Sequence, residues 1–268
     1  MTKIPYENRI GLAVMDAQTF HNGHAALLEA MKDAVPFQIV ALGSTNLHGC
    51  LGHPFTFEQR IEMIEKVFGQ RTFNFVRLKD IDASADNDDW INYVLQKIAD
   101  IGLPFPTDYF TGSEIDALWY ESAFCKISNE TLVKPKDLTL RANRNRPLKT
   151  HIDPASDKRT HVLSRGESAI PSGRNIRFLI ERRDERWRWF VPPDLEQYIE
   201  WNYPPHLRQA IVGQTPPGVH DVPIGTRFRS TTAPAGFQIV LELKDDLQWR
   251  PNKPDEKAAY ADNRNKGD

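Results

Sequence analysis

Short apolar runs alternate with segments of helical periodicity along the first 112 residues of the chain. The runs predict strands over residues 10–15, 37–43, 73–78 and 108–112, and the periodic segments predict helices over residues 24–34, 56–68 and 90–101. Strands that alternate with helices in this way are typical of an α/β fold with a Rossmann-like, doubly wound parallel sheet. We therefore expect ligands to bind beyond the carboxyl ends of these strands.

The pattern changes twice after this alternating region. Residues 128–162 are polar and basic and lack clear periodicity, so we expect an insertion that either lies near the site or forms a solvated surface loop. The apolar pair Val162-Leu163 indicates a final strand at the end of this stretch. After residue 205 the chain is rich in proline and glycine, with a predicted hairpin of residues 226–229 with 237–243 and a polar, disordered tail from residue 249. The sequence thus predicts a main domain over residues 1–205 and a C-terminal extension over residues 206–268.

Charge and composition exclude several classes of partner. The 268 residues carry a net charge of −2, which gives no general attraction to nucleic acid or to an anionic membrane. No apolar run reaches membrane-spanning length, and residues 1–6 lack a signal-peptide core. The two cysteines, Cys50 and Cys125, favour a reducing, cytoplasmic location over a disulfide framework. The sequence is compatible with a homo-oligomer and does not decide the oligomeric state.

Two histidines mark the junction between the first predicted strand and the first predicted helix. His21 and His24 lie three residues apart, and Gly23 precedes the second of them. Free N–H groups and the helix dipole favour an anion at such a position, and glycine allows a close approach to the backbone. Both imidazoles can donate hydrogen bonds to phosphate oxygens. The constellation suits a nucleoside triphosphate; the alternative is a turn with two solvated histidines.

This His-x-Gly-His pattern resembles the signature of the HIGH nucleotidyltransferase superfamily, whose members transfer a nucleotidyl unit from ATP or CTP and release pyrophosphate. The segment after the second strand is similar to that of archaeal-type nicotinamide mononucleotide (NMN) adenylyltransferases and of their bacterial relatives fused to Nudix domains. It carries a Gly43-Ser44 strand end, a His53-Pro54-Phe55 turn and an Arg-x-x-Met helix that begins at Arg60. The alternative for Arg60 is an ordinary surface position on a helix.

A third block resembles the part of this family that holds the nicotinamide nucleotide. Asp80 follows the third strand, and Asn87 and Trp90 precede or open the next helix. In the family the indole stacks on the pyridinium ring, and such a cation–π contact contributes about 1 kcal/mol or more. The alternative for Trp90 is a core residue at the start of a helix.

The resemblance continues to about residue 202. The Thr111-Gly112-Ser113 strand end matches the family's fourth strand, where backbone groups approach the nucleotide. Residues 170–177 resemble the family's second phosphate motif, in which Ser172 matches the serine and Arg177 the closing arginine. A serine and backbone amides that open a helix form an anion site, with an arginine beside it.

The chain departs from the family pattern at two places. Asp16 stands where the family has an arginine that faces phosphate. A carboxylate there repels a triphosphate by a few kcal/mol unless a cation or base intervenes. We conjecture that Arg174, at a family threonine, restores the missing charge. The second departure is the tail, because no Nudix hydrolase pattern follows residue 205.

The resemblance implies a reaction of ATP with NMN that gives NAD and pyrophosphate, by in-line attack of the NMN phosphate on the ATP α-phosphate. Mg²⁺ would accompany ATP, largely through water, without a dedicated set of protein metal ligands. The implied roles are catalysis for His21, His24 and Arg177; ATP binding for Gln18, Phe20, Gly23, Gly112, Ser172 and Arg174; and NMN binding for Ser44, Arg60, Asp80, Asn87 and Trp90.

Three alternatives stay open at this point. The acceptor can be another phosphorylated compound, as in a cytidylyltransferase or a phosphopantetheine adenylyltransferase. The chain can also be a nucleotide-binding protein without catalysis, in which Asp16 reports a decayed site. In the third alternative the basic stretch and the tail contact another macromolecule, with the transferase domain as a scaffold.

Overall fold

A computed structural model of the chain describes residues 3–81, 87–124, 129–133, 148–163, 171–232 and 240–251. The strands are β1 (Ile10–Met15), β2 (Phe37–Leu42), β3 (Asn74–Arg77), β4 (Asp108–Thr111), β5 (Asn129–Val133), β6 (Leu148–Ile152), β7 (Arg159–Leu163), β8 (Ile211–Gly213), β9 (Arg227–Ser230), β10 (Val240–Leu243) and β11 (Trp249–Pro251). The α-helices are α1 (Asn22–Ala34), α2 (Phe57–Phe68), α3 (Asn87–Asp100), α4 (Glu114–Phe124), α5 (Gly173–Glu181) and α6 (Glu196–Asn202). Short 3-10 helices are η1 (Tyr6–Asn8), η2 (Glu185–Phe190), η3 (Pro193–Leu195) and η4 (Pro205–Leu207).

The main sheet has seven strands in the order β3-β2-β1-β4-β7-β6-β5. The first five of these pair in parallel, and β6 and β5 add an antiparallel ribbon at one edge. The chain starts at β1 in the middle, winds outward through β2 to β3, and then crosses to β4 and β7. The predicted α/β fold with a doubly wound sheet is confirmed.

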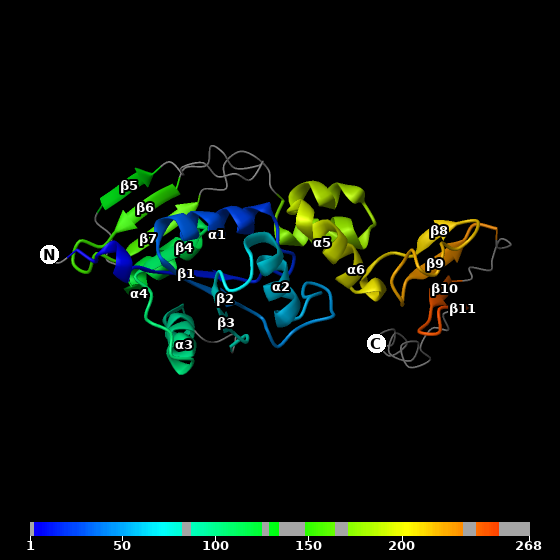
Figure 1. Ribbon diagram of the computed structural model, residues 1–268, viewed down its shortest axis with the longest axis horizontal. Helices are drawn as coiled ribbons and strands as arrows, with labels where there is room; N and C mark the ends of the chain where they lie inside the picture. The colour runs from blue at the N-terminus through cyan, green and yellow to red at the C-terminus, as the bar shows by residue number, and fades with distance from the viewer. Residues whose placement is uncertain are drawn as a thin grey trace, which may run out of the picture.

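Helices cover both faces of this sheet. Figure 1 shows α1 and α3 on opposite sides of it. One apolar core lies under α1, α2, α5 and α6, and a second lies under α3 and α4. Gly11 of β1 explains how closely α1 approaches: a Cβ at this residue would lie 2.7 Å from Val35 Cγ2 and 2.9 Å from Met31 Cγ. The helix that carries the two histidines is therefore fixed against the central strand.

The basic segment expected to be an irregular insertion differs from that prediction. Three strands, β5, β6 and β7, lie within residues 129–163, and β7 pairs in parallel with β4 inside the main sheet. Polar residues face the interior of this segment: Thr150, Thr160 and His161 are all buried. Because these polar residues are buried beside the apolar Leu148, Val162 and Leu163, the alternating pattern of a half-buried strand is interrupted in the sequence. Residues 134–147, which hold most of the basic side chains, lie outside the described residues.

The C-terminal residues form a second sheet of four strands in the order β11-β10-β9-β8. Figure 1 shows it beyond α5 and α6, away from the main sheet. Strands β9 and β10 pair antiparallel, from Val240 opposite Arg229 to Glu242 opposite Arg227. The disordered tail was predicted to begin at residue 249, but Trp249–Pro251 is a strand; residues 252–268 lie outside the described residues. Within the described ranges, every helix is too short or too polar to cross a bilayer.

A buried polar network joins β4, β6 and β7 at the edge opposite the carboxyl ends of the strands. Arg9 Nη1 donates to both oxygens of Asp108, at 3.1 and 2.9 Å. His161 Nε2 lies 2.9 Å from Asp108 Oδ1, and its Nδ1 lies 2.9 Å from the Thr150 hydroxyl. Because a carboxylate only accepts, Nε2 carries the proton and Nδ1 accepts from Thr150. Burial lowers the pKa of His161 despite the opposing pull of Asp108.

This network predicts a loss of stability in mild acid. Below pH about 6.5 an unfolded chain protonates His161, whereas the buried imidazole resists protonation, so the free energy of unfolding falls as the pH falls. The slope contributed by one proton reaches at most about 1.4 kcal/mol per pH unit. Urea unfolding between pH 5 and 7.5 should show a shallower slope for His161→Gln than for the parent protein. His220→Gln, at an exposed histidine, is the control; equal slopes in all three proteins would contradict the prediction.

Candidate functional site

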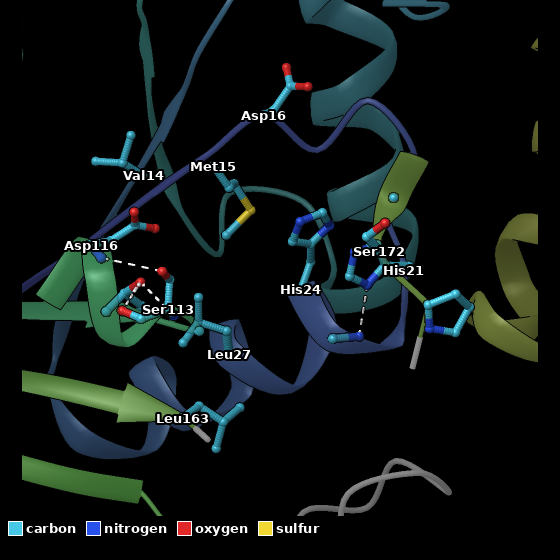
Figure 2. A pocket seen from close by; sticks show the side chains of 15 residues that line it. Val14, Met15, Asp16, His21, His24, Leu27, Ser113, Asp116, Leu163 and Ser172 are labelled. Carbon is cyan, nitrogen blue, oxygen red and sulfur yellow. Dashed lines mark hydrogen bonds between the residues drawn. The ribbon is translucent and has the colours of Figure 1, made fainter. Parts of the chain in front are cut away.

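A cavity of about 280 Å³ opens at the carboxyl ends of β1, β4 and β7. The first turns of α1, α4 and α5 close its sides. Its lining consists of Val14, Met15, Asp16, His21, Gly23, His24, Leu27, Thr111, Gly112, Ser113, Asp116, Leu163, Pro171, Ser172 and Gly173. Figure 2 shows the two histidines and Ser172 at one end of this cavity, and Ser113 and Asp116 at the other. Both ends therefore present polar groups around an apolar middle.

The two histidines are held by the start of α1. His21 is the N-cap of the helix, and its Nδ1 accepts a hydrogen bond of 3.0 Å from the Gly23 amide. Because Nδ1 accepts, the proton of a neutral His21 lies on Nε2, which is left as the donor. The His21 and His24 rings stack with their centroids 3.8 Å apart. The two stacked rings therefore lie at the N-terminal end of a helix, where anions bind favourably.

The start of α5 faces the same histidines. The Ser172 hydroxyl caps this helix by accepting from the Asn175 amide at 3.4 Å. A Cβ on Gly173 would lie 3.4 Å from Arg177 Nη1 and 3.9 Å from His21 Nε2, so both side chains approach the open side of the glycine. Two helix N-termini, an imidazole and a guanidinium thus converge on one end of the cavity. This arrangement favours phosphate groups.

The end of β4 forms the opposite wall. Thr111 Oγ1 accepts from the Ser113 amide at 3.0 Å, and the Asp116 amide donates to Ser113 Oγ at 3.2 Å. These bonds turn the backbone at Gly112 and start α4, so that Asp116 lies in the first turn of the helix. The sequence placed the Thr111-Gly112-Ser113 strand end beside the nucleotide, but Asp116 was missed as a lining residue. The Thr-Gly-Ser turn before an acidic first helical turn was the available signal.

Asp16 lies directly after β1 among several cationic side chains. Its carboxylate is 3.5 Å from Arg60 Nη1 and 3.8 Å from His53 Nδ1, and its side chain is 44% exposed. Burial raises the pKa of Asp16, while the charges of His53, Arg60 and Arg177 oppose this rise. The carboxylate that replaces the family's arginine is thus partly neutralised by its neighbours.

A second hollow of about 490 Å³ adjoins the first and shares Asp16 with it. Leu51, Gly52, His53, Arg174, Arg177, Phe178 and Glu181 complete its lining. Arg174 is exposed on the first turn of α5, and Arg177 lies one turn further along. The two arginines and Asp16 therefore face the same space, as the conjecture of charge compensation by Arg174 requires.

Three residues with implied ligand roles are buried in the framework instead. Phe20 is fully buried and packs edge-on against Phe68, and Gln18 Oε1 accepts from the Phe55 amide at 3.0 Å. Arg60 is fully buried, so it is not the surface helix residue considered as its alternative. Its Nη1 donates to the carbonyls of Asp16 and Gly43, each at 2.7 Å. These side chains shape the site from beneath rather than line it.

The residues expected to hold NMN lie along the carboxyl edge beside β2 and β3. Ser44 has a φ of +49° and donates to Asp80 Oδ1 at 2.7 Å. Trp90 is half-buried, with its ring 5.7 Å from that of Tyr93. The side chain of Asn87, at the start of α3, lies outside the described residues. The structure brings Ser44 and Asp80 together but places both, with Trp90, outside the described linings of the two hollows.

Metal-ligating residues do not cluster in the part of the chain that the structure describes. No group of three or more His, Cys, Asp or Glu residues there could hold a metal ion. Two carboxylates, Asp16 and Asp116, line the first cavity.

Comparison with known proteins identifies similar chains. The cytidylyltransferase-like family model matches residues 17–120. A nicotinamide-nucleotide adenylyltransferase of Methanocorpusculum labreanum is 29% identical over 122 residues, which are 45% of this chain and 68% of the relative. The enzyme of the same name from Methanococcus aeolicus is 27% identical over 139 residues, 51% of this chain and 78% of the relative. The resemblance inferred from the sequence motifs is confirmed.

A solved structure was also found. It is a bifunctional NMN adenylyltransferase/ADP ribose pyrophosphatase from Francisella tularensis, complexed with AMP and a manganese ion. The identity is 20% and the TM-score 0.32, over 43% of this chain and 34% of that chain. This chain therefore spans about a third of the solved one.

The burial of Arg60 generates a stability prediction. Arg60→Met removes the donors of the Asp16, Gly43 and Thr56 carbonyls. We expect the free energy of unfolding to fall by roughly 2–5 kcal/mol, because these groups lose their partner away from water. Arg77→Met is the matched control: Arg77 pairs with Glu58 on the surface, and its loss should cost less than about 1 kcal/mol. Equal urea midpoints for the two variants would show that the Arg60 contacts carry little stability.

Proposed function

We propose that this chain, similar over residues 17–120 to the cytidylyltransferase-like family, is an adenylyltransferase that joins ATP and NMN to give NAD and pyrophosphate. One observation carries the proposal: the N-termini of α1 and α5 lie at the same end of the cavity, and His21 and Arg177 both approach the open side of Gly173. The names of the archaeal relatives support adenylyl transfer to a nicotinamide nucleotide. We assign this reaction to residues 1–205.

The cavity at the ends of β1 and β4 would hold the nucleotide end of ATP. Gly23 and Gly112 leave the backbone open there, and Leu27 and Leu163 give the apolar contact that a base needs. His21 Nε2 and His24 would donate to oxygens of the α-phosphate. The NMN phosphate is already an anion at neutral pH, so its attack on phosphorus needs no general base. Catalysis then rests on alignment and on stabilisation of the charge that develops.

The second hollow would take the β- and γ-phosphates, which leave as pyrophosphate. Arg174 and Arg177 line it, and Ser172 and the amides that open α5 stand at its junction with the first cavity. Asp16 at the same junction would repel a triphosphate. The nearby charges of Arg60 and Arg177 reduce this repulsion.

The site suits Mg²⁺ bound mainly through substrate phosphates and water, as is usual in nucleotide enzymes. One or two carboxylates, with substrate phosphates and water, make an ordinary magnesium site, and Asp16 and Asp116 are the carboxylates that line the cavity. When bound, the cation would neutralise part of the charge of the triphosphate.

The acceptor would lie along the edge beside β2 and β3. Ser44 and Asp80 are joined by a hydrogen bond there, and Trp90 offers an aromatic face. A pyridinium ring is a cation, so an aromatic face and a carboxylate favour NMN over an uncharged acceptor.

The reaction is tested by pyrophosphate release with ATP and Mg²⁺, with NMN, nicotinic acid mononucleotide and phosphopantetheine offered in parallel. Release with NMN, together with the appearance of NAD, is the expected result. Release with phosphopantetheine alone would move the acceptor to another class. ATP binding without pyrophosphate release in the presence of any acceptor would show a nucleotide-binding protein without catalytic activity.

His24 provides the first mutational prediction. His24→Ala should lower kcat roughly 100-fold or more, because one donor to the transferring phosphate is lost, while the Kd for NMN changes less than about twofold. His24→Asn keeps an N–H donor and should retain more activity. Steady-state kinetics and NMN titration measure the two quantities. Full activity of His24→Ala would refute the role of the histidine.

Arg174 provides the second mutational prediction. Arg174→Ala should weaken ATP binding about 3- to 10-fold at low salt, and the effect should shrink at high salt because the side chain is exposed. If Arg174 offsets Asp16, the loss should be smaller in an Asp16→Asn background. Arg186→Ala, at an exposed arginine paired with Asp184, is the control. Unchanged ATP affinity in Arg174→Ala would disprove compensation.

A further inference from the structure

The family match covers residues 17–120, yet His206, far beyond it in the chain, contacts a wall of the second hollow. That wall is a tight turn, which we call the 49–54 hairpin. Its two arms are joined by an antiparallel β-bridge between Cys50 and His53 and by a hydrogen bond from the Gly49 amide to the Pro54 carbonyl. Leu51, Gly52 and His53 line the hollow.

The tip of this hairpin has few apolar contacts of its own. Leu51 is 70% exposed and Cys50 is exposed, and Gly49 and Gly52 have positive φ values of 66° and 87°. Segments that bury little apolar surface and depend on exposed backbone hydrogen bonds open readily. Contacts with the rest of the chain therefore add to the few interactions that hold the hairpin in one position.

The C-terminal part of the chain supplies that contact. His206 Nε2, on η4, lies 2.9 Å from the Gly49 carbonyl, and because a carbonyl only accepts, Nε2 is the donor. The next residue after the hairpin, Phe55, is fully buried edge-on against Tyr203 at the end of α6. The hairpin is thus held at its base, by His206 at Gly49 and by Tyr203 at Phe55.

The C-terminal sheet in turn holds η4. Arg227 of β9 donates from Nη2 to the carbonyls of His206 and Arg208, at 3.1 and 2.6 Å. Gly225 packs against Pro205, where a Cβ on the glycine would lie 3.6 Å from Pro205 Cβ. A continuous path of contacts therefore runs from β9 through η4 to the hairpin.

We propose that His206 is a positioning residue, and that the C-terminal sheet serves to fix the 49–54 hairpin as the wall of the second hollow. The consequence for ligands rests on the proposed function: the hollow takes the pyrophosphate end of ATP. Loss of the contact should then weaken the binding of ATP and of pyrophosphate, while the affinity for NMN stays the same. Since His206 lies outside the linings of both hollows, the chemical step should change little.

The variants His206→Ala and His206→Gln test this proposal, because glutamine keeps an N–H donor. His220→Ala, at an exposed histidine of the same part of the chain, is the matched control. Hydrogen exchange of the Gly49, Cys50 and His53 amides reports the hairpin directly. Calorimetric titration with inorganic pyrophosphate reports the hollow, and steady-state kinetics give KM for ATP, KM for NMN and kcat.

For His206→Ala we expect hairpin exchange about 2- to 10-fold faster, and a similar rise in the pyrophosphate Kd and in KM for ATP, because one hydrogen bond is lost. KM for NMN and kcat should change less than about twofold, and His206→Gln should restore most of the loss. Unchanged hairpin exchange, or an equal effect of His220→Ala, would overturn the proposal. If neither the parent protein nor any variant transfers adenylyl groups, the proposed function fails. Hydrogen exchange of the hairpin and pyrophosphate binding still decide the role of His206.

Discussion

The buried guanidinium of Arg60 is the interaction on which the site depends. It joins the chain just after β1 to the chain just after β2, through the carbonyls of Asp16 and Gly43. These two segments carry the groups that face the hollows and the acceptor edge. Arg60 joins them just beyond the last backbone hydrogen bond between them, from the Gly43 amide to the Met15 carbonyl. Burial lowers the pKa of Arg60, and the charge of Asp16 opposes that effect. The family's arginine at position 16 would place two cations together here, whereas an aspartate gives Arg60 a counter-charge.

The helix starts explain why part of the site could be predicted from sequence. Ser172 is an N-cap, a local feature with a recognisable residue pattern, and His21 at the other helix start was found from its spacing to Gly23 and His24. The doubly wound topology then brings helix starts to one edge of the sheet. Arg60 could not be assigned in the same way, because its partners come from strand ends 44 and 17 residues away.

The edge of the main sheet was hidden for a different reason. Strands β6 and β7 bury Thr150 and His161, which satisfy each other and Asp108 by hydrogen bonds. A buried polar network has no apolar periodicity, so a segment of this kind is easily taken for a loop. The contact between His206 and the 49–54 hairpin is also invisible in the sequence, since it joins residues 157 positions apart.

The stacked imidazoles of His21 and His24 have a consequence for the entropy of binding. Each ring is restrained by its neighbour, and one is also restrained by the Gly23 amide. The rotational freedom of these side chains is therefore lost when the protein folds, rather than when a ligand arrives. A phosphate that enters the cavity meets donors that are already oriented. Less of the favourable binding free energy is then offset by side-chain entropy. The entropy loss occurs on folding instead, where the packing of α1 on β1 at Gly11 compensates for it.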